Sequence, residues 1–275
     1  MSDRRPLAWR EAAIDGALLG AFMVSAGAFG TLLYAPASPV AAWPALARDL
    51  AMGLAMASTA AAIFYSRAGQ RSGAHLNPAV TLAFLRLGKI APADAVAYWI
   101  AQPLGGVLGV LAVRAAFGDA FVAPPVNSVA TLPGRWGEGA AFAAEIAMTF
   151  VLFSVVLALS NDRRRMRWTG AAAATLVGLF VAFEAPVSGM SLNPARTFAS
   201  ALPSGLWSGF WIYLAAPAAG MLAAAELFAR RRGLGAVLCA KLHHTDRHDC
   251  IFRCGFCRHL GAAGDIQAAN PRSGA

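Results

Sequence analysis

Six long apolar runs, separated by short polar breaks, dominate the 275-residue chain. A helix of about 20 apolar residues crosses the roughly 30 Å hydrocarbon core of a membrane, and the runs are close to that length. They lie at residues 13–34, 50–66, 93–113, 139–160, 169–187 and 206–229. The pattern therefore predicts an all-α integral membrane protein with six transmembrane helices.

Two of the polar breaks carry the same phrase, Ser-Gly-x-x-Leu-Asn-Pro-Ala, at residues 72–79 and 188–195. Each phrase leads into a short apolar piece, at 78–86 and 194–203, which reaches only about half-way across a bilayer at about 1.5 Å per residue. Asn is favoured at a helix N-cap and Pro at the first helical position, so both pieces are expected to be re-entrant half-helices. Three spans in each half of the chain then make an inverted repeat.

The repeat divides the chain into a membrane domain and two end segments. The predicted parts are an N-terminal segment at 1–11, a membrane domain at 12–229 with repeats at about 12–115 and 138–229, and a tail at 230–275.

Half-helices that enter from opposite faces bring their N-termini together near the mid-plane, each with roughly half a positive charge. The motif residues there are Asn77, Pro78, Ala79, Asn193, Pro194 and Ala195. The two Asn amides can donate hydrogen bonds to a solute oxygen. Arg196 adds a fixed positive charge, and an Arg at membrane depth is usually functional. The site is expected to admit neutral molecules and repel cations.

Composition and charge fit a membrane protein. Hydrophobic residues make up 58% of the chain and charged residues 13%, with a mean hydropathy of +0.55. The net charge of +9 could suit nucleic acid, but most of the 23 Lys and Arg residues fall at the two chain ends and in loops on the same side. The positive-inside rule then places both termini in the cytoplasm. The Arg-rich stretch 161–167 is interpreted as a cytoplasmic loop, and no nucleic-acid partner is expected.

The paired Asn-Pro-Ala motifs, with Ser-Gly before each and Arg196 after the second, resemble those of the major intrinsic proteins, the aquaporins and glycerol facilitators. The stretch 98–106, which begins Tyr-x-x-Ala-Gln, adds to a resemblance that runs from about residue 11 to 229. It implies an aquaporin-like fold in the inner (plasma) membrane, a pore in each subunit of a homotetramer and no cofactor for transport. Water, glycerol, hydrogen peroxide and urea-like molecules are the implied solutes.

The resemblance also implies a narrow filter. It is built from one residue of the second span, one of the fifth span, one of the second re-entrant loop, and the Arg that follows the second motif. Counting without gaps from the two motif Asn residues gives Ala57, Val181, Met190 and Arg196. Water-specific members resemble one another in having an aromatic ring and a His at the first two places. The filter of this chain is therefore expected to be wider and less polar and to pass small solutes, with the alternative that Met190 fills the opening.

Three further polar residues lie near the predicted re-entrant loops. Glu145, inside the fourth span, is expected to accept hydrogen bonds from a loop backbone, with Asp15 as its counterpart in the first half. His75 lies two residues before Asn77 and is expected to support the loop or line the vestibule.

The tail holds all four cysteines and four of the five histidines. Its candidate ligands for zinc or another thiophilic ion are Cys239, His243, His244, Cys250, Cys254 and Cys257. Disulfides are disfavoured in the cytoplasm, which favours metal binding. The spacing matches no standard zinc finger, so a tail with incidental thiols, or an acylated Cys239, stays an alternative.

Two other function classes remain open. One is a metal- or redox-gated channel controlled by the Cys/His tail. The other is an ion-coupled secondary transporter, because inverted repeats with broken helices occur there too. An enzyme is not expected, since the spans show no Ser/His/Asp arrangement, nucleotide loop or catalytic metal motif.

Overall fold

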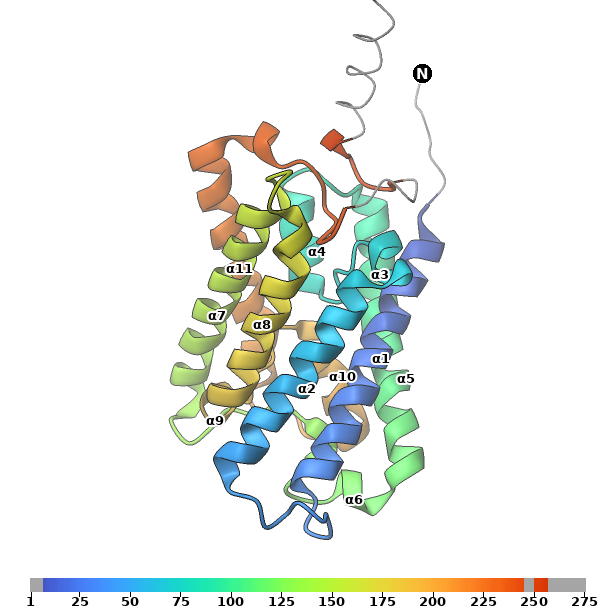
Figure 1. Cartoon of the computed structure of the whole chain (residues 1–275), viewed down its shortest axis with the longest axis vertical. Coiled ribbons are helices and arrows are strands. Elements are labelled where there is room, and N and C mark those ends of the chain that lie inside the picture. Colours follow the sequence, from blue (N-terminus) through green and yellow to red (C-terminus); the bar gives the residue numbers. More distant parts are fainter. Residues whose placement is uncertain (1–6, 245–249, 257–275) are drawn as a thin grey trace, which may run out of the picture.

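A computed structural model describes residues 7–244 and 250–256. Among these residues, six helical segments are long and apolar enough to cross a membrane, and there is no strand. They are α1 (Trp9–Tyr34), α2 (Ala45–Tyr65), α5 (Pro92–Phe117), α7 (Gly137–Ser160), Met166–Phe183, which joins η2 (Met166–Trp168) to α8 (Thr169–Phe183), and α11 (Phe210–Arg232). In Figure 1, α1 begins and α11 ends at the same, upper end of the bundle. The predicted all-α, six-span fold is confirmed.

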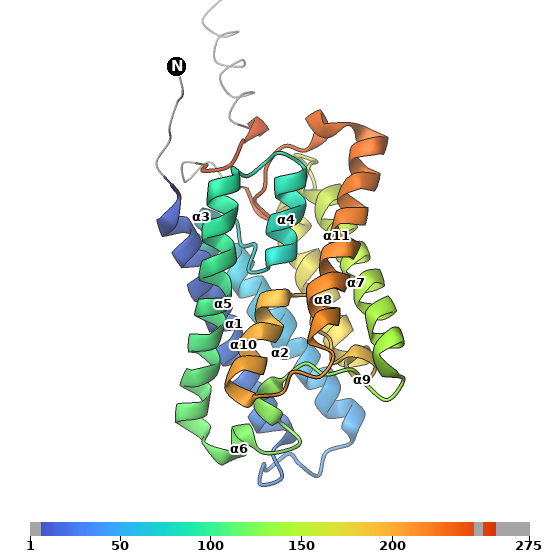
Figure 2. The ribbon, with the colours of Figure 1, turned by 180° about the vertical axis from the view of Figure 1, so that it is seen from behind.

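Two shorter helices, α4 (Pro78–Arg86) and α10 (Pro194–Ser204), are the half-helices. Figure 2 shows α4 in the upper half of the bundle and α10 in the lower half. Each starts at the proline of its motif because the preceding Asn side chain caps it. Asn77 Oδ1 accepts a hydrogen bond from Ala79 N at 2.8 Å, and Asn193 Oδ1 accepts one from Ala195 N at 3.0 Å.

Short helices fill the connections among the described residues. α3 (Arg67–Ser72) leads from α2 to α4, and α9 (Ala185–Ser188) leads from α8 to α10. α6 (Asp119–Val122) and η1 (Asn127–Val129) lie between α5 and α7, and η3 (Leu234–Ala236) follows α11. α3 and α9 both end at a glycine with positive φ, Gly73 at +92° and Gly189 at +75°. A left-handed residue ends a helix and turns the chain, here into the re-entrant loops.

Most spans start or end a few residues from the predicted limits, and three of the differences have a local cause. The fifth ends at Phe183 instead of 187, since Pro186 has no N–H with which to continue a helix. The second begins at Ala45 instead of 50, with Pro44 at its N-cap, and the sixth begins at Phe210 instead of 206, after Gly209 in the left-handed region.

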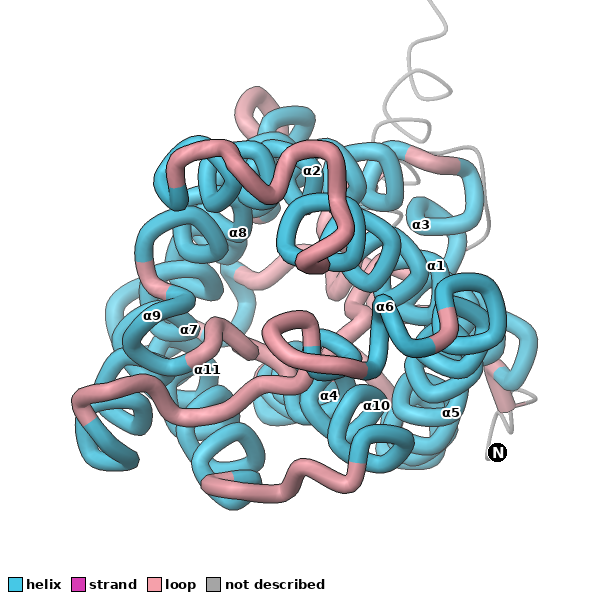
Figure 3. The backbone as a smooth tube through the Cα atoms, turned by 90° about the horizontal axis from the view of Figure 1, so that it is seen from below, coloured by secondary structure: helices cyan, strands magenta, loops and turns pink. Residues whose placement is uncertain are grey.

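Glycines let α1 and α5 pack with their backbones almost in contact. A Cβ on Gly105 would lie 2.0 Å from Gly16 O, and one on Gly109 would lie 2.3 Å from Gly20 O. Close approach at small residues is the usual basis of helix association in lipid. Seen along the bundle in Figure 3, the helices surround a central region into which loops reach.

The chain beyond α11 folds back over the upper end of the bundle. In Figure 1 this orange-red segment crosses the helix ends and dips between them. We call residues 237–244 and 250–256 the docked tail, and the end of the bundle interior that it covers the tail-side mouth.

Candidate functional site

A buried carboxylate in each repeat holds the re-entrant loop of that repeat. In the first repeat, Asp15 Oδ1 accepts hydrogen bonds from Ser72 Oγ at 2.9 Å and His75 N at 3.0 Å. Its Oδ2 accepts one from Leu76 N at 2.7 Å. The carboxylate thus satisfies backbone donors that neither helix nor sheet could pair.

Glu145 makes the same set of contacts in the second repeat. Its Oε1 accepts from Ser188 Oγ at 2.9 Å and from Ser191 N at 2.6 Å. Its Oε2 accepts from Leu192 N at 2.7 Å. Glu145, like Asp15, is fully buried. The two repeats therefore support their loops through equivalent atoms.

The loops hold a strained backbone that aims two carbonyls at the opposite repeat. Leu76 and Leu192 have φ of +52° and +59°, in the left-handed region that side chains disfavour. Leu76 O accepts a hydrogen bond from Asn193 Nδ2 at 2.6 Å, and Leu192 O accepts one from Asn77 Nδ2 at 2.7 Å. These reciprocal bonds join the two motifs and use one N–H of each amide.

A cavity of about 390 Å³ extends through the bundle beside this junction. Its wall includes Tyr34 and Asp49 near the lower end and Leu242 in the docked tail. The predicted pore and filter residues on the wall are Asn77, Val181, Met190, Asn193 and Arg196, and the predicted loop-support residue His75 lies there too. The second N–H of each motif amide is therefore available to a molecule in the cavity.

Arg196 lies on this wall, and one nitrogen of its guanidinium group is an unused hydrogen-bond donor within the described part of the chain. Its Nη1 is buried and has no hydrogen-bond partner among the described residues. Burying such a donor is unfavourable unless it bonds to a molecule in the cavity. The motif residues Pro78, Ala79, Pro194 and Ala195 are not on the wall; they start the half-helices.

The second-span residues on the cavity wall do not include the predicted one. The wall holds Met52 and Met56 of α2, one helical turn apart, but not Ala57. Ala57 faces α8 instead, where its Cβ lies 2.7 Å from the Cβ position of Gly178. One residue along a helix is a rotation of about 100°, enough to move a side chain from the cavity to a helix contact.

His75 connects the first loop to the docked tail. Its Nδ1 lies 2.9 Å from Thr81 Oγ1, and its Nε2 lies 2.9 Å from the carbonyl oxygen of Ala240. A carbonyl only accepts, so Nε2 carries the hydrogen. The sequence predicted loop support or a vestibule position for His75, but gave no sign of this partner in the tail.

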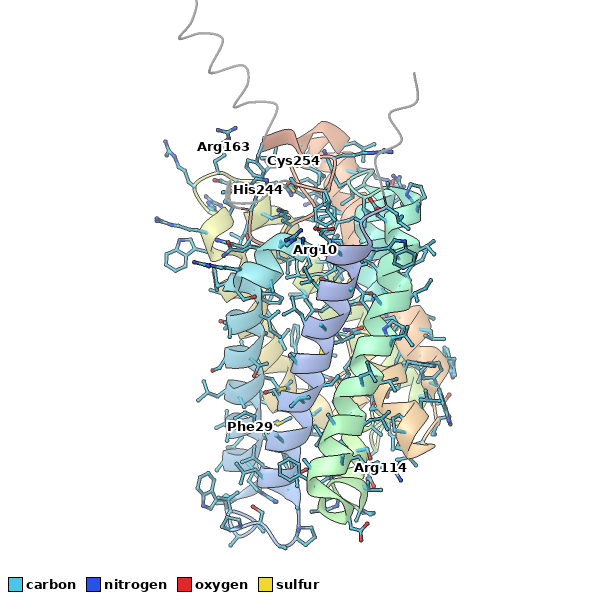
Figure 4. All side chains as sticks on the ribbon, turned by 90° about the vertical axis from the view of Figure 1, so that its right-hand side faces the viewer. Arg10, Phe29, Arg114, Arg163, His244 and Cys254 are labelled. Carbon is cyan, nitrogen blue, oxygen red and sulfur yellow. The ribbon has the colours of Figure 1, made fainter. Side chains whose placement is uncertain are left out.

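Four tail residues gather into a cluster, which we call the Cys/His cluster: Cys239, His244, Cys250 and Cys254. Their ligand atoms all lie within 4.8 Å of one another, and Figure 4 shows His244 and Cys254 close together at the upper end. His243 was predicted as a ligand but is not in this cluster, because its ring packs edge-on against Tyr65 at 4.9 Å. Cys257 lies outside the described residues.

The family profile described as "Major intrinsic protein" matches residues 8–228, which include both half-helices, the first five spans and all but the last four residues of α11. The chain belongs to the major intrinsic protein family. The match ends before the docked tail, so the family accounts for the repeat and its cavity but not for the Cys/His cluster.

Individual relatives of this family member are aquaporins. It is 39% identical over 158 residues to Aquaporin NIP1-3 of Oryza sativa subsp. japonica, covering 57% of this chain and 54% of the relative. It is 36% identical over 185 residues to Probable aquaporin AqpM of Archaeoglobus fulgidus, covering 65% of this chain and 74% of the relative. The chain thus spans about half the length of the plant relative.

A solved structure shares the fold. It is the aquaglyceroporin from Plasmodium falciparum, with a TM-score of 0.61 and 22% sequence identity, covering 80% of this chain and 95% of that one. The similarity supports the six-span, two-half-helix architecture.

Proposed function

We propose that this protein is a passive transmembrane channel for water and small neutral solutes such as glycerol, hydrogen peroxide or urea-like molecules. The observation that carries the proposal is the cavity wall where Asn77, Asn193 and Arg196 meet the N-termini of two half-helices. Amide donors replace some of the hydrogen bonds a solute loses on leaving water. The helix dipoles and the Arg charge oppose cations, including protons.

A passive channel fits the buried carboxylates better than an ion-coupled transporter does. Asp15 and Glu145 are occupied by loop hydrogen bonds, and neither is among the residues that line the cavity. A proton- or ion-coupled cycle needs titratable groups that are free to exchange along the path. Two that line the cavity are held by hydrogen bonds: Asp49 Oδ1 accepts one from the Tyr34 hydroxyl at 2.7 Å, and both ring nitrogens of His75 have partners. The proposal requires no cofactor for transport and no catalytic step.

We assign the selectivity filter to Met56, Val181, Met190 and Arg196. The first three side chains present apolar walls and the fourth presents donors. Such a filter lacks the aromatic and His pair of water-specific members. It favours passage of small solutes that bear both a carbon skeleton and hydroxyl or amide groups.

Location and assembly follow from the charge and the family. Arg163 of the middle loop and Arg10 lie toward the same end as the tail in Figure 4, and the last turn of α11 is basic. This favours a cytoplasmic position for both termini in the inner (plasma) membrane. We propose a homotetramer in the lipid bilayer, with a pore in each subunit, and no nucleic-acid partner. The Cys/His cluster is proposed to hold zinc or another thiophilic ion.

Osmotic shock of vesicles that contain the full chain tests the channel. Vesicles treated with a zinc chelator and a reductant are mixed with an impermeant sugar or with glycerol, and light scattering follows their volume. We expect faster shrinkage than in lipid-only vesicles, and fast re-swelling in glycerol. Lipid-only rates in both solutions would overturn the proposal.

Shortening Met190 should widen the filter. We expect Met190→Ala to speed glycerol re-swelling severalfold while changing water flux much less, because water already fits. Alanine is compatible with the backbone there, since Ala74 holds the equivalent place in the first repeat at φ +55°, close to the +50° of Met190. Leu54→Ala on the exposed outer face of α2 is the control. Unchanged glycerol flux would remove Met190 from the filter.

Removing the Arg196 charge should weaken cation exclusion. A unit charge about 5 Å away raises the energy of a cation by roughly 1–3 kcal/mol, depending on the local dielectric. We therefore expect Arg196→Leu to increase cation leak about tenfold or more at equal water flux. Vesicles with a potassium gradient and a potential-sensitive dye measure the leak. Arg196→Lys keeps the charge and should stay tight; equal leak in both variants would contradict the electrostatic role.

A further inference from the structure

The docked tail is buried like a protein core although it follows the arginine-rich end of α11. Val237, Cys239, Ala240 and Lys241 are each at most 1% exposed. Side chains of this burial do not belong to a solvated appendage. The segment is therefore seated in the end of the bundle.

Backbone hydrogen bonds attach the docked tail to several parts of the membrane domain. Leu242 N donates to Gly73 O at 3.2 Å, at the start of the first re-entrant loop. Arg253 N donates to Lys89 O at 2.9 Å, beyond α4. Leu238 N donates to the Oδ1 of Asn161 at 2.6 Å, in the loop between the repeats.

The tail occupies the tail-side mouth of the cavity. Leu242 is part of the cavity wall, and the Phe252 ring stacks on His75 with centroids 5.3 Å apart and an interplanar angle of 21°. The fit is close, because a Cβ on Gly73 would lie 2.7 Å from the Phe252 ring. A solute that passes the motif Asn residues would meet these tail side chains on this side.

The Cys/His cluster has the dimensions of a tetrahedral metal site. Cys239 Sγ lies 3.5 Å from Cys250 Sγ, and Cys254 Sγ lies 3.1 Å from His244 Nε2. Zinc bonds of about 2.3 Å to sulfur and about 2.0 Å to nitrogen place tetrahedral ligands roughly 3.5–3.8 Å apart. Small shifts would bring all four atoms onto one ion.

The charge around the cluster also suits a metal–thiolate centre. Zinc with three thiolates and a neutral imidazole carries one negative charge, and Lys241 is a buried cation whose Nζ has no hydrogen-bond partner among the described residues. The thiolate is the form that binds metal.

The docked tail has little regular structure to hold it in place. Its described residues contain only a short helical turn at Gly255 and Phe256, so few backbone hydrogen bonds stabilise it internally. The ligands come from both described parts, with Cys239 and His244 before the gap and Cys250 and Cys254 after it. An ion bound by all four would tie these parts together, as structural zinc does in small domains.

We infer that zinc, or a similar thiophilic ion, bound by Cys239, His244, Cys250 and Cys254 holds the docked tail in the tail-side mouth and closes the channel, and that loss of the ion opens it. The inference rests on the proposed channel function. It makes the tail a metal-responsive gate for passive flux.

Metal binding is tested first on the purified full chain. We expect a single zinc per chain by elemental analysis, and a thiolate-to-cobalt charge-transfer band after exchange with Co²⁺. Cys250→Ser should lose both. Arg253→Ala, with an exposed side chain in the same segment, is the matched control and should keep both. Wild-type protein without zinc or the cobalt band would overturn the metal site.

Closure is tested by osmotic shock of phosphatidylcholine–phosphatidylglycerol vesicles with zinc or with a chelator on both sides. We expect water flux near the lipid-only rate with zinc and a severalfold rise with chelator. Cys250→Ser should be fast in both. Phe252→Ala keeps the four ligands but loses the ring that stacks on His75. This variant should therefore retain zinc, yet show fast water flux even in the presence of zinc. This variant separates the metal site from the closure.

The outcomes distinguish the gate from the channel itself. Fast flux in wild type with zinc bound would overturn the gate and leave the channel function standing. Lipid-only rates in every variant and condition would overturn the channel function. Flux that responds to a thiol reductant but not to chelator would indicate that a disulfide, and not a metal ion, holds the tail in place. That result would overturn the proposal.

Discussion

Glu145→Ala should leave little correctly folded protein. The change removes the acceptor for two buried backbone N–H groups, Ser191 N and Leu192 N, and for the Ser188 hydroxyl. Each unsatisfied buried donor costs about 1–3 kcal/mol, so three approach the 5–15 kcal/mol that holds a typical domain together. Size-exclusion chromatography and thermal unfolding in detergent measure the loss.

Matched variants separate this effect from the loss of charge. Glu145→Gln keeps one acceptor oxygen and should fall between Glu145→Ala and wild type. Glu138→Ala removes an exposed carboxylate near the start of the same helix, with a single solvent-exposed hydrogen bond from Trp211 Nε1, and should cost far less than Glu145→Ala. Asp15→Ala should fail like Glu145→Ala, because Asp15 holds the first loop through equivalent atoms. An unfolding midpoint for Glu145→Ala within about 2 °C of wild type would contradict the loop-support role, since losses of this size shift a midpoint by many degrees.

Gly105→Ala should abolish or severely reduce folding through a single added methyl group. The new Cβ would lie 2.0 Å from Gly16 O and would meet backbone, which cannot rotate away. α1 and α5 would have to separate where their backbones pack closely. The loss in folding free energy should be well above the usual ~1–3 kcal/mol for overpacking. The monodisperse fraction recovered from membranes, and its melting temperature, report the effect.

Gly139→Ala is the natural control for this glycine. Among the described residues, no neighbouring heavy atom lies within 4 Å of a Cβ built on Gly139, and the residue is in the first turn of α7. Alanine is favoured over glycine in a helix by about 1 kcal/mol, so this variant should match wild type or be slightly more stable. Equal behaviour of Gly105→Ala and Gly139→Ala would refute the close packing of α1 and α5.

The repeat could be predicted from the sequence because its signals are local. The Asn-Pro pairs set the starts of α4 and α10 at Pro78 and Pro194, as the N-cap rule requires. The lengths of the apolar runs gave the six spans. The equivalent roles of Asp15 and Glu145 could also be predicted, since both are acidic residues inside apolar runs.

The rest depends on contacts that a linear pattern does not encode. The choice between Met56 and Ala57 is a rotation of one helix about its axis, which neighbouring glycines such as Gly178 decide. His243 and His244 are adjacent in sequence, yet one packs on Tyr65 and the other joins the Cys/His cluster. The docking of the tail on His75 brings together residues far apart in the chain, and no hydrophobic periodicity in the tail predicts this contact.

The central claim is that neutral molecules pass between the two Asn-Pro-Ala motifs while charge does not. The most direct measurement follows vesicle volume and internal pH together, in vesicles that hold chelator-treated full-length protein and a pH-sensitive dye, after an osmotic shock across a pH gradient. Fast shrinkage with the pH gradient kept at its lipid-only lifetime is the result expected from the Asn77, Asn193 and Arg196 wall. A pH gradient that collapses as fast as the water moves, or shrinkage no faster than in lipid alone, would contradict it.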